Sequence, residues 1–504
     1  MEQQIVILPG TPDDENREYL PEIIKTTDTV VNENGNNSQV YPERLKEYKE
    51  ALADDMEDIW YEYVPASYDE NKKTPLVIGM HGGLMTGWGQ AIYTSWTMMA
   101  DRDGFICIFP NANKRRLWTV ECKPEECDPK TLETKPDAFL FNQFPEKIED
   151  NHDIKFVLAL IELMKEKYNI DAGRIFMQGM SLGNMMTGQF SRYFGNILAG
   201  AAGAGGPSDL HLIFDDDGKI NNRAGHLAIW QSRPELNGLP PGKWFDEYRV
   251  NTYNRLYWMR LNGCEFVPQI SIKGEYNYAF YKGKKADLVY LDIKNRDHGQ
   301  TLDDAALVWD YFFSGVKRHE DGTITCTETI EERKGDEFSI SVADGCKKAW
   351  LNNSIVEMSS PAIKWQKLKY HGLDGGQKVR GEYLCVPLSF IADIFGAEYE
   401  KSDDTLSAVL KLKDGRRLQF ARGSIGCVVD NSIRSMYCEA LHRNDELHIS
   451  IEWFCSAMYD LHVSSYEGVT YVTDHFSILS MNMADLIRDL LNDRPVPEDY
   501  DSWI

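Results

Sequence analysis

The chain has 504 residues and a net charge of -25, from 54 Lys and Arg against 79 Asp and Glu. This charge would repel a phosphate backbone or an anionic membrane, so nucleic acid is excluded as an expected partner. The length predicts two or three domains, and a hydrophobic content of 42% can fill their cores. The sequence contains no membrane span of about 18 apolar residues and no secretion signal after Met1, which predicts a cytoplasmic protein, or a secreted or cell-surface one if the N-terminus is trimmed.

The first half of the chain alternates between strand and helix patterns after a polar N-terminal extension, residues 1–56. Apolar runs predict strands at 59–64, 75–80 and 104–110, and the period of the apolar residues predicts helices near 94–101 and over 153–168. Strands that alternate with helices at this spacing favour the α/β class, with a mostly parallel sheet flanked by helices.

A serine between two glycines is the most informative motif. Gly179-Met180-Ser181-Leu182-Gly183 follows the apolar run 174–178 and precedes a helical pattern. A strained strand-to-helix turn of this kind lifts a serine hydroxyl clear of the sheet, and flanking glycines leave room for the backbone to cross. The motif therefore predicts a nucleophile elbow with Ser181 at its apex.

The pattern continues to about residue 320. Strands are expected at 198–203, 226–230 and 287–293, and helices over 246–262 and 303–313. The polar insertion 208–225 contains Asp215-Asp216-Asp217-Gly218, but the first and last ligand positions of a calcium loop are absent, so we interpret it as a turn. The predicted first domain spans residues 57–320 and is followed by a charged linker, 321–337.

An internal repeat occupies the C-terminal third. The pattern of 353–358 recurs at 431–436, and that of 384–392 recurs at 447–455, in the same order. Each copy predicts a hairpin, a helix and a further strand pair, which gives a smaller α+β module at 338–485. Residues 486–504 are interpreted as an acidic tail.

A serine nucleophile needs a histidine base and an acid that orients it, in the chain order serine, acid, histidine. His298 lies just past the last predicted sheet strand, on the same edge as Ser181. Glu235, after the strand that begins at 226, is the favoured acid; Asp246 is the alternative, although a carboxylate at a helix start is equally explained as a cap.

The remaining site residues are backbone donors and aromatic side chains. The amide of Leu182 and the loop at Gly83 and Leu84, after His81, are the expected oxyanion donors. Trp88, Trp118 and Trp230 are candidates for a substrate pocket, although each is equally compatible with core packing. The cysteines and histidines have no evident metal-ligand spacing, so we expect no metal and no cofactor.

The span from about 59 to 316 resembles the polyhydroxybutyrate depolymerases and the feruloyl and acetylxylan esterases. The resemblance rests on Leu76 to Gly83, on Tyr168 to Phe176, and on Gly179 to Met186. It implies an α/β-hydrolase fold and ester hydrolysis through an acyl-enzyme. The chain departs from that family where an aspartate usually follows a His-Gly turn, since it has Trp230-Gln231-Ser232-Arg233-Pro234-Glu235 there.

The repeated module resembles the stalk-like domain named after the N-terminus of copper amine oxidases, chiefly through residues 386–397. Such modules are common on surface-associated bacterial proteins, which implies a surface partner or a homo-oligomer through this module. The leading hypothesis is a serine esterase acting on a small-molecule or polymeric ester. A serine peptidase on the same fold and a non-catalytic surface or carbohydrate-binding protein are the alternatives.

Overall fold

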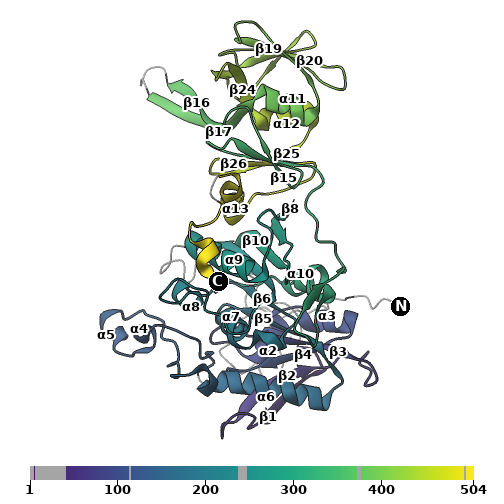
Figure 1. The fold of residues 1–504 in the computed structure, drawn as a ribbon, viewed down its shortest axis with the longest axis vertical. Coiled ribbons are helices and arrows are strands. Elements are labelled where there is room, and N and C mark those ends of the chain that lie inside the picture. Colours follow the sequence, from purple (N-terminus) through teal and green to yellow (C-terminus); the bar gives the residue numbers. More distant parts are fainter. Residues whose placement is uncertain (1–4, 6–40, 113–114, 237–246, 372–375, 493–494) are drawn as a thin grey trace.

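A ten-stranded mixed sheet forms the body of the larger part of the molecule (Figure 1). The computed structural model describes residues 5, 41–112, 115–236, 247–371, 376–492 and 495–504. In spatial order the strands are β1 (Leu45–Glu50), β2 (Asp58–Tyr63), β4 (Ile106–Pro110), β3 (Thr74–Met80), β5 (Ile170–Met180), β6 (Gly200–Ala204), β7 (Ala228–Leu236), β10 (Leu288–Asp297), β9 (Tyr276–Tyr281) and β8 (Gln269–Lys273). From β4 to β10 neighbouring strands are parallel, and the outer strands at both edges are antiparallel.

Helices cover both faces of this sheet, because its central strands are apolar on both sides. One buried cluster joins the sheet to α6 (His152–Lys167), α7 (Leu182–Phe194) and α9 (Glu247–Asn262). The other joins it to α2 (Gly87–Tyr93), α3 (Trp96–Asp103) and α10 (Asp304–Tyr311). The predicted α/β class with a mostly parallel, helix-flanked sheet is therefore confirmed.

Shorter elements connect these layers. They are α4 (Pro124–Cys127), α5 (Thr131–Thr134), α8 (Leu210–Ile213), the 3-10 helices η2 (Ile148–Asp150), η3 (Gly195–Ile197), η4 (Phe313–Gly315) and η5 (Tyr500–Trp503), and the hairpin of β11 (Val316–Arg318) and β12 (Ile324–Cys326).

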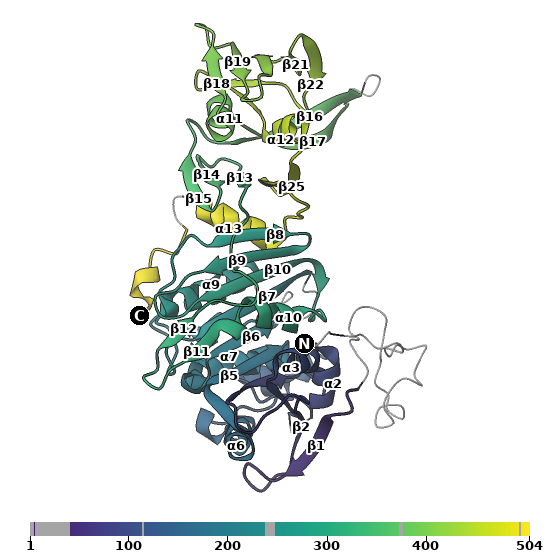
Figure 2. The same ribbon diagram turned by 90° about the vertical axis from the view of Figure 1, so that its right-hand side faces the viewer.

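The C-terminal module stands at the opposite end of the molecule from β1 (Figures 1 and 2). It contains three antiparallel sheets and two helices, α11 (Leu388–Phe395) and α12 (Ile451–Tyr459). Its first sheet contains β15 (Ser354–Glu357), β14 (Lys348–Leu351), β13 (Ser339–Ala343), β26 (Val469–Thr473) and β25 (His462–Tyr466). Its second contains β16 (Ile363–His371), β17 (Gly376–Pro387), β24 (Glu446–Ser450) and β23 (Leu441–Arg443). Its third contains β18 (Glu398–Lys401), β19 (Ser407–Lys411), β20 (Arg417–Ala421), β21 (Gly426–Val429) and β22 (Ser432–Ser435).

The two sequence repeats are also structural repeats. In each copy a hairpin (β14 and β15, then β21 and β22) precedes a strand that leads into a helix (β17 into α11, then β24 into α12), and a strand pair follows. The equivalent strands β17 and β24 pair with each other, with Val386 opposite Ile449. The module is thus built from two similar units joined through their helix-bearing strands.

Two boundary expectations differ from the structure. The extension 1–56 includes β1, which pairs with β2 and so belongs to the large sheet. The expected acidic tail includes most of α13 (Met481–Leu491) and η5. α13 packs between the large sheet and the first sheet of the module, and the Trp503 ring of η5 lies edge-on to Phe214, with an exposed fraction of 2%. Residues 6–40 lie outside the described residues.

Two buried thiols in the module predict a disulfide under oxidising conditions. Cys385 on β17 and Cys438 before β23 have Sγ atoms 3.6 Å apart and are 53 positions apart in sequence. We expect oxidised glutathione to link them, releasing two reduced glutathione molecules, and the closed loop to stabilise the module by about 4 kcal/mol. Peptide mass spectrometry checks the link and thermal melting of wild type against Cys438→Ser checks the gain. An unchanged melting temperature after complete linkage would contradict the expected stabilisation.

Candidate active site

Ser181 occupies a strained turn between β5 and α7. Its backbone angles are φ 55° and ψ -120°, which a non-glycine residue rarely adopts. The flanking glycines are required sterically: a Cβ on Gly179 would lie 2.1 Å from the Gly183 carbonyl oxygen, and one on Gly183 would lie 2.2 Å from that of Met80. The Ser181 hydroxyl makes no helix-capping bond. The sequence motif therefore forms the turn that it predicts.

His298 reaches the same edge of the sheet, in the loop directly after β10. A Cβ on Gly205 would lie 3.2 Å from His298 Cε1 and 4.0 Å from the Ser181 amide nitrogen. Gly205 and its neighbour Gly206 both have positive φ, and a Cβ on Gly206 would lie 2.4 Å from the Ser181 carbonyl oxygen. The glycine pair after β6 thus allows the imidazole and the elbow to approach each other. This role was not predicted from the sequence, although two adjacent glycines at a strand end are a visible signal.

Glu235 lies on β7, on the strand adjacent to the one that leads to His298. Leu236 pairs with Asp297, so Glu235 lies one position before the residue that pairs with the end of the strand leading to His298. The Glu235 side chain is 4% exposed. Its Oε2 accepts from the Asn295 amide at 3.0 Å, and its Oε1 accepts from Lys294 Nζ at 2.8 Å and from the Met481 amide at 2.7 Å. The alternative acid, Asp246, lies outside the described residues.

One of the backbone amides expected to stabilise the oxyanion already donates a hydrogen bond within the protein. The Leu84 amide donates to the Arg116 carbonyl at 2.9 Å, so it is already engaged. Gly83 faces the start of α7, because a Cβ on it would lie 3.7 Å from Leu182 Cβ. Leu182 is the first residue of α7, where backbone amides point out of the helix without an intrahelical acceptor. Of the two loop amides, the Leu84 amide is therefore engaged within the protein, and Gly83 lies beside Leu182.

His81 supports this loop from within the core. Its Nδ1 is 2.6 Å from the Gly82 carbonyl oxygen, and its Nε2 accepts from the Ala112 amide at 2.9 Å. The side chain is fully buried, and burial lowers its pKa to about 4. A neutral imidazole satisfies both bonds, so His81 is a structural residue of the loop that contains Gly83 and Leu84.

Replacing His81 should change how stability depends on pH. The unfolded chain binds a proton at a histidine pKa near 6.5, whereas the folded chain does so only near 4, so the free energy of unfolding falls as the pH drops through this window. The contribution is about 3 kcal/mol. We expect the stability difference between wild type and His81→Gln, measured by urea unfolding, to narrow by that amount from pH 7 to pH 4. A pH-independent difference would contradict the neutral buried imidazole.

A buried network of hydrogen bonds fixes the segment that follows His298. Asp304, at the start of α10, accepts from Ser232 Oγ at 2.7 Å and from Gln300 Nε2 at 2.7 Å. Burial raises the pKa of Asp304 to about 6. The Gln300 amide donates to the Tyr93 hydroxyl at 3.1 Å, which anchors the segment two residues after His298. Sequence reasoning missed this network, since Asp304 has the local appearance of an ordinary helix-start carboxylate.

The three candidate pocket tryptophans have different environments. Trp118 and Trp230 are fully buried, with their indole N–H groups donating to the His81 carbonyl and to Ser232 Oγ. Neither side chain is exposed, so neither lines an open substrate cleft, the role for which the sequence made them candidates. Trp88, on α2 directly after the loop of Gly83 and Leu84, is half-buried.

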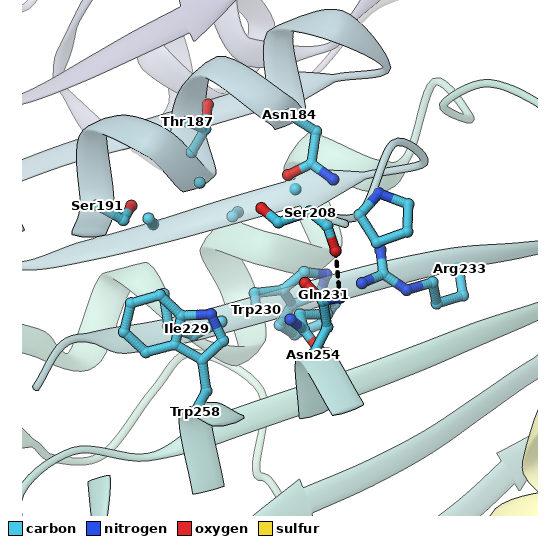
Figure 3. A pocket seen from close by; sticks show the side chains of 15 residues that line it. Asn184, Thr187, Ser191, Ser208, Ile229, Trp230, Gln231, Arg233, Asn254 and Trp258 are labelled. Atoms are coloured by element: carbon cyan, nitrogen blue, oxygen red, sulfur yellow. Dashed lines mark hydrogen bonds between the residues drawn. The ribbon is translucent and has the colours of Figure 1, made fainter. Parts of the chain in front are cut away.

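A small polar hollow lies beneath α7 (Figure 3). Its polar lining includes Asn184, Gln231, Arg233 and Asn254, and Asn254 Nδ2 donates to the Ser208 carbonyl at 2.8 Å. The hollow has a volume of about 40 Å³, which suits a few waters. The hollow is therefore too small for an aryl ester or a sugar.

The described residues give no support for a metal centre or a membrane helix. Among them, no group of three or more His, Cys, Asp or Glu side chains is arranged to hold an ion. The Asp215 carboxylate accepts from the amides of Asp217 and Lys219, which confirms the predicted turn. No helix in these ranges has the length and apolar character needed to cross a bilayer.

Comparison with known proteins finds short matches to esterases. The chain is 25% identical over 147 residues to a bifunctional acetylxylan esterase/xylanase of Neocallimastix patriciarum, and 26% identical over 149 residues to feruloyl esterase B of Thermothelomyces thermophilus. These matches cover 29% of this chain but 17% and 43% of the two relatives, so less than half of either relative is matched. No family model matches the chain.

Among solved structures, an acetyl xylan esterase from Aspergillus awamori aligns with 54% of this chain and 98% of its own length, at 13% identity and a TM-score of 0.37. A ferulic acid esterase from Anaeromyces mucronatus aligns with 54% and 91%, at 16% identity and a TM-score of 0.33.

The topology itself decides the fold. The parallel strands run in the order β4-β3-β5-β6-β7-β10, and the central strand β5 ends in a strained serine at the start of α7. A histidine follows the last parallel strand at the same edge. This arrangement of sheet, elbow and histidine is that of an α/β-hydrolase fold, to which a smaller antiparallel module is added at the C-terminus.

Proposed function

We propose that the protein is a serine esterase that hydrolyses carboxylic esters through an acyl-enzyme. The observation that carries the proposal is the meeting of the strained Ser181 turn and the His298 ring around Gly205 at the carboxyl edge of the parallel sheet. The curated relatives that match part of the chain are named as acetylxylan and feruloyl esterases, which supports an ester as the substrate.

In the proposed reaction, Ser181 Oγ attacks the ester carbonyl while His298 takes its proton. The amides of Leu182 and Gly83 donate to the oxygen on which negative charge develops. His298 then protonates the leaving alcohol, and a water molecule activated by the same imidazole releases the acid and restores Ser181. Glu235 is the proposed acid that orients His298 and stabilises its charged form, and Trp88 is the remaining pocket candidate.

The proposed acyl group is acetyl or hydroxycinnamoyl, on a small-molecule or polymeric alcohol. A panel of acetyl, longer-chain, aryl and feruloyl esters, tested beside dipeptidyl amides, measures this preference. Turnover of acetyl or feruloyl esters is the expected result. Hydrolysis of amides alone would favour a peptidase, and hydrolysis of neither would favour a binding role for the chain.

We also propose that the repeated module mediates contact with a surface or with a second copy of the chain. Its outermost sheet presents an apolar side chain to solvent, Ile433 on β22, which is 80% exposed. Sedimentation velocity of wild type and Ile433→Asp tests the homo-oligomer. If the wild type sediments as a monomer, the homo-oligomer is excluded, and an external surface is the proposed partner of the module.

A further inference from the structure

The N-terminus of α13 reaches Glu235 from the far end of the chain. The Met481 amide donates to Glu235 Oε1 at 2.7 Å, although the two residues are 246 positions apart. We propose that α13 positions the acid of the site: the Met481 main-chain amide, and not its side chain, holds the Glu235 carboxylate toward the loop of His298. The inference rests on the proposed function, in which Glu235 is the triad acid.

The start of α13 is fixed to the large sheet by bonds on both sides of Met481. The Ser480 amide donates to Asn277 Oδ1 at 3.1 Å, and Asn277 Nδ2 donates to the Ile478 carbonyl at 3.0 Å. On the other side, Asn482 Nδ2 donates to Asp292 Oδ1 at 3.1 Å. Asn277 is fully buried on β9, and Asp292 is fully buried on β10. The Met481 amide is therefore placed by the sheet that carries the acid.

The charged surroundings of Glu235 also depend on this helix. Lys294 forms an ion pair with Glu235, and its ammonium lies 5.2 Å from the centre of the Tyr466 ring in the module. Burial raises the pKa of Asp292 to about 7, although hydrogen bonds from Ser480 and Asn482 oppose the rise. The Glu235 carboxylate in turn raises the pKa of Asp292, and the positive end of the α13 dipole faces Glu235.

This arrangement makes the C-terminal segment more than a connector. The residues before α13 continue directly from β26 of the module. They form two hydrogen bonds with the edge of the large sheet: the Gly274 amide donates to the Phe476 carbonyl at 3.0 Å, and the Ile478 amide donates to the Gly274 carbonyl at 2.9 Å. The module and the acid are thus joined by one continuous, hydrogen-bonded stretch.

Met481→Pro removes the amide N–H that donates to Glu235, and it should change the helix little. Met481 is the first helical residue, where proline is well tolerated, and Ser480 before it is already extended, with ψ at 162°. Met481→Ala is the matched control, because it shortens the same half-buried side chain but keeps the amide. We expect kcat on an ester substrate to fall about tenfold in the proline variant with KM within twofold, and both constants to stay within twofold in the alanine variant.

A double-mutant comparison separates positioning from general damage. In a Glu235→Gln background, the proline substitution should lower kcat no further, since the charged acceptor is already gone. Equal kcat for the proline and alanine variants, or the same tenfold loss in the Glu235→Gln background, would overturn the inference.

Two outcomes would contradict the proposed function instead. An unchanged kcat in Glu235→Gln would remove Glu235 as the acid, and an active Ser181→Ala would remove the nucleophile. Thermal melting of each variant checks folding. If the proline variant melts well below wild type, Asn277→Ala, which releases the Ser480 anchor, replaces it in the same comparison with the same expected loss in kcat and the same overturning results.

Discussion

Ser181→Ala should lower kcat by about 10⁴-fold to 10⁶-fold, because the hydroxyl is the proposed nucleophile and the remaining site can only bind and polarise the substrate. The fold should be intact, since the hydroxyl makes no capping bond and alanine keeps the Cβ. Steady-state hydrolysis of an aryl acetate, with circular dichroism as the folding control, checks this result.

Ser181→Gly separates strain from chemistry at the same position. It should be as inactive as the alanine variant, yet more stable by about 1 kcal/mol, since glycine adopts a φ of 55° without a steric cost. Urea unfolding of the two variants measures the difference. A glycine variant less stable than the alanine variant would show that the serine turn is not strained.

Removal of the C-terminal segment should abolish the folded sheet domain. Met483, Ile487, Leu491 and Trp503 belong to the same buried cluster as the core of α6 and α7, and each is at most 2% exposed. Exposing these four side chains costs on the order of 10 kcal/mol, which is similar to the whole stability of a typical domain.

Two truncations make this prediction specific. A chain ending at Lys317 lacks the module and the segment, and one ending at Thr473 keeps the module strands but loses α13 and η5. We expect both to be insoluble or to bind a hydrophobic dye, as measured by the soluble fraction and by dye fluorescence. A soluble chain ending at Thr473 with the wild-type melting temperature would contradict the claim that 474–504 completes the core.

The strained turn at Ser181 and the position of His298 after the last parallel strand were predictable from the sequence, because local chemistry determines both. Gly179 and Gly183 are required by backbone clashes within the turn itself, and His298 follows directly on the last parallel strand. The engagement of the Leu84 amide was not predictable, because its acceptor belongs to Arg116 in a different loop.

Other features were missed for two different reasons. The hairpin of β8 and β9 has a visible signal in the alternation of Ile270, Ile272, Tyr276 and Tyr278 around Gly274, which the sequence analysis did not use. The return of α13 has no such signal. The spacing of Met483, Ile487 and Leu490 predicts a buried helix face, but no local pattern says that the helix packs between the first sheet of the module and β10 of the large sheet.

Covalent labelling of the nucleophile tests the central claim most directly. An aryl phosphonate that reacts with activated serines is incubated with wild type and with His298→Ala, and the modified residue is located by peptide mass spectrometry. The account predicts one phosphonyl group per chain, on Ser181, and greatly slowed labelling in the histidine variant. No adduct, an adduct on another serine, or labelling independent of His298 would contradict it.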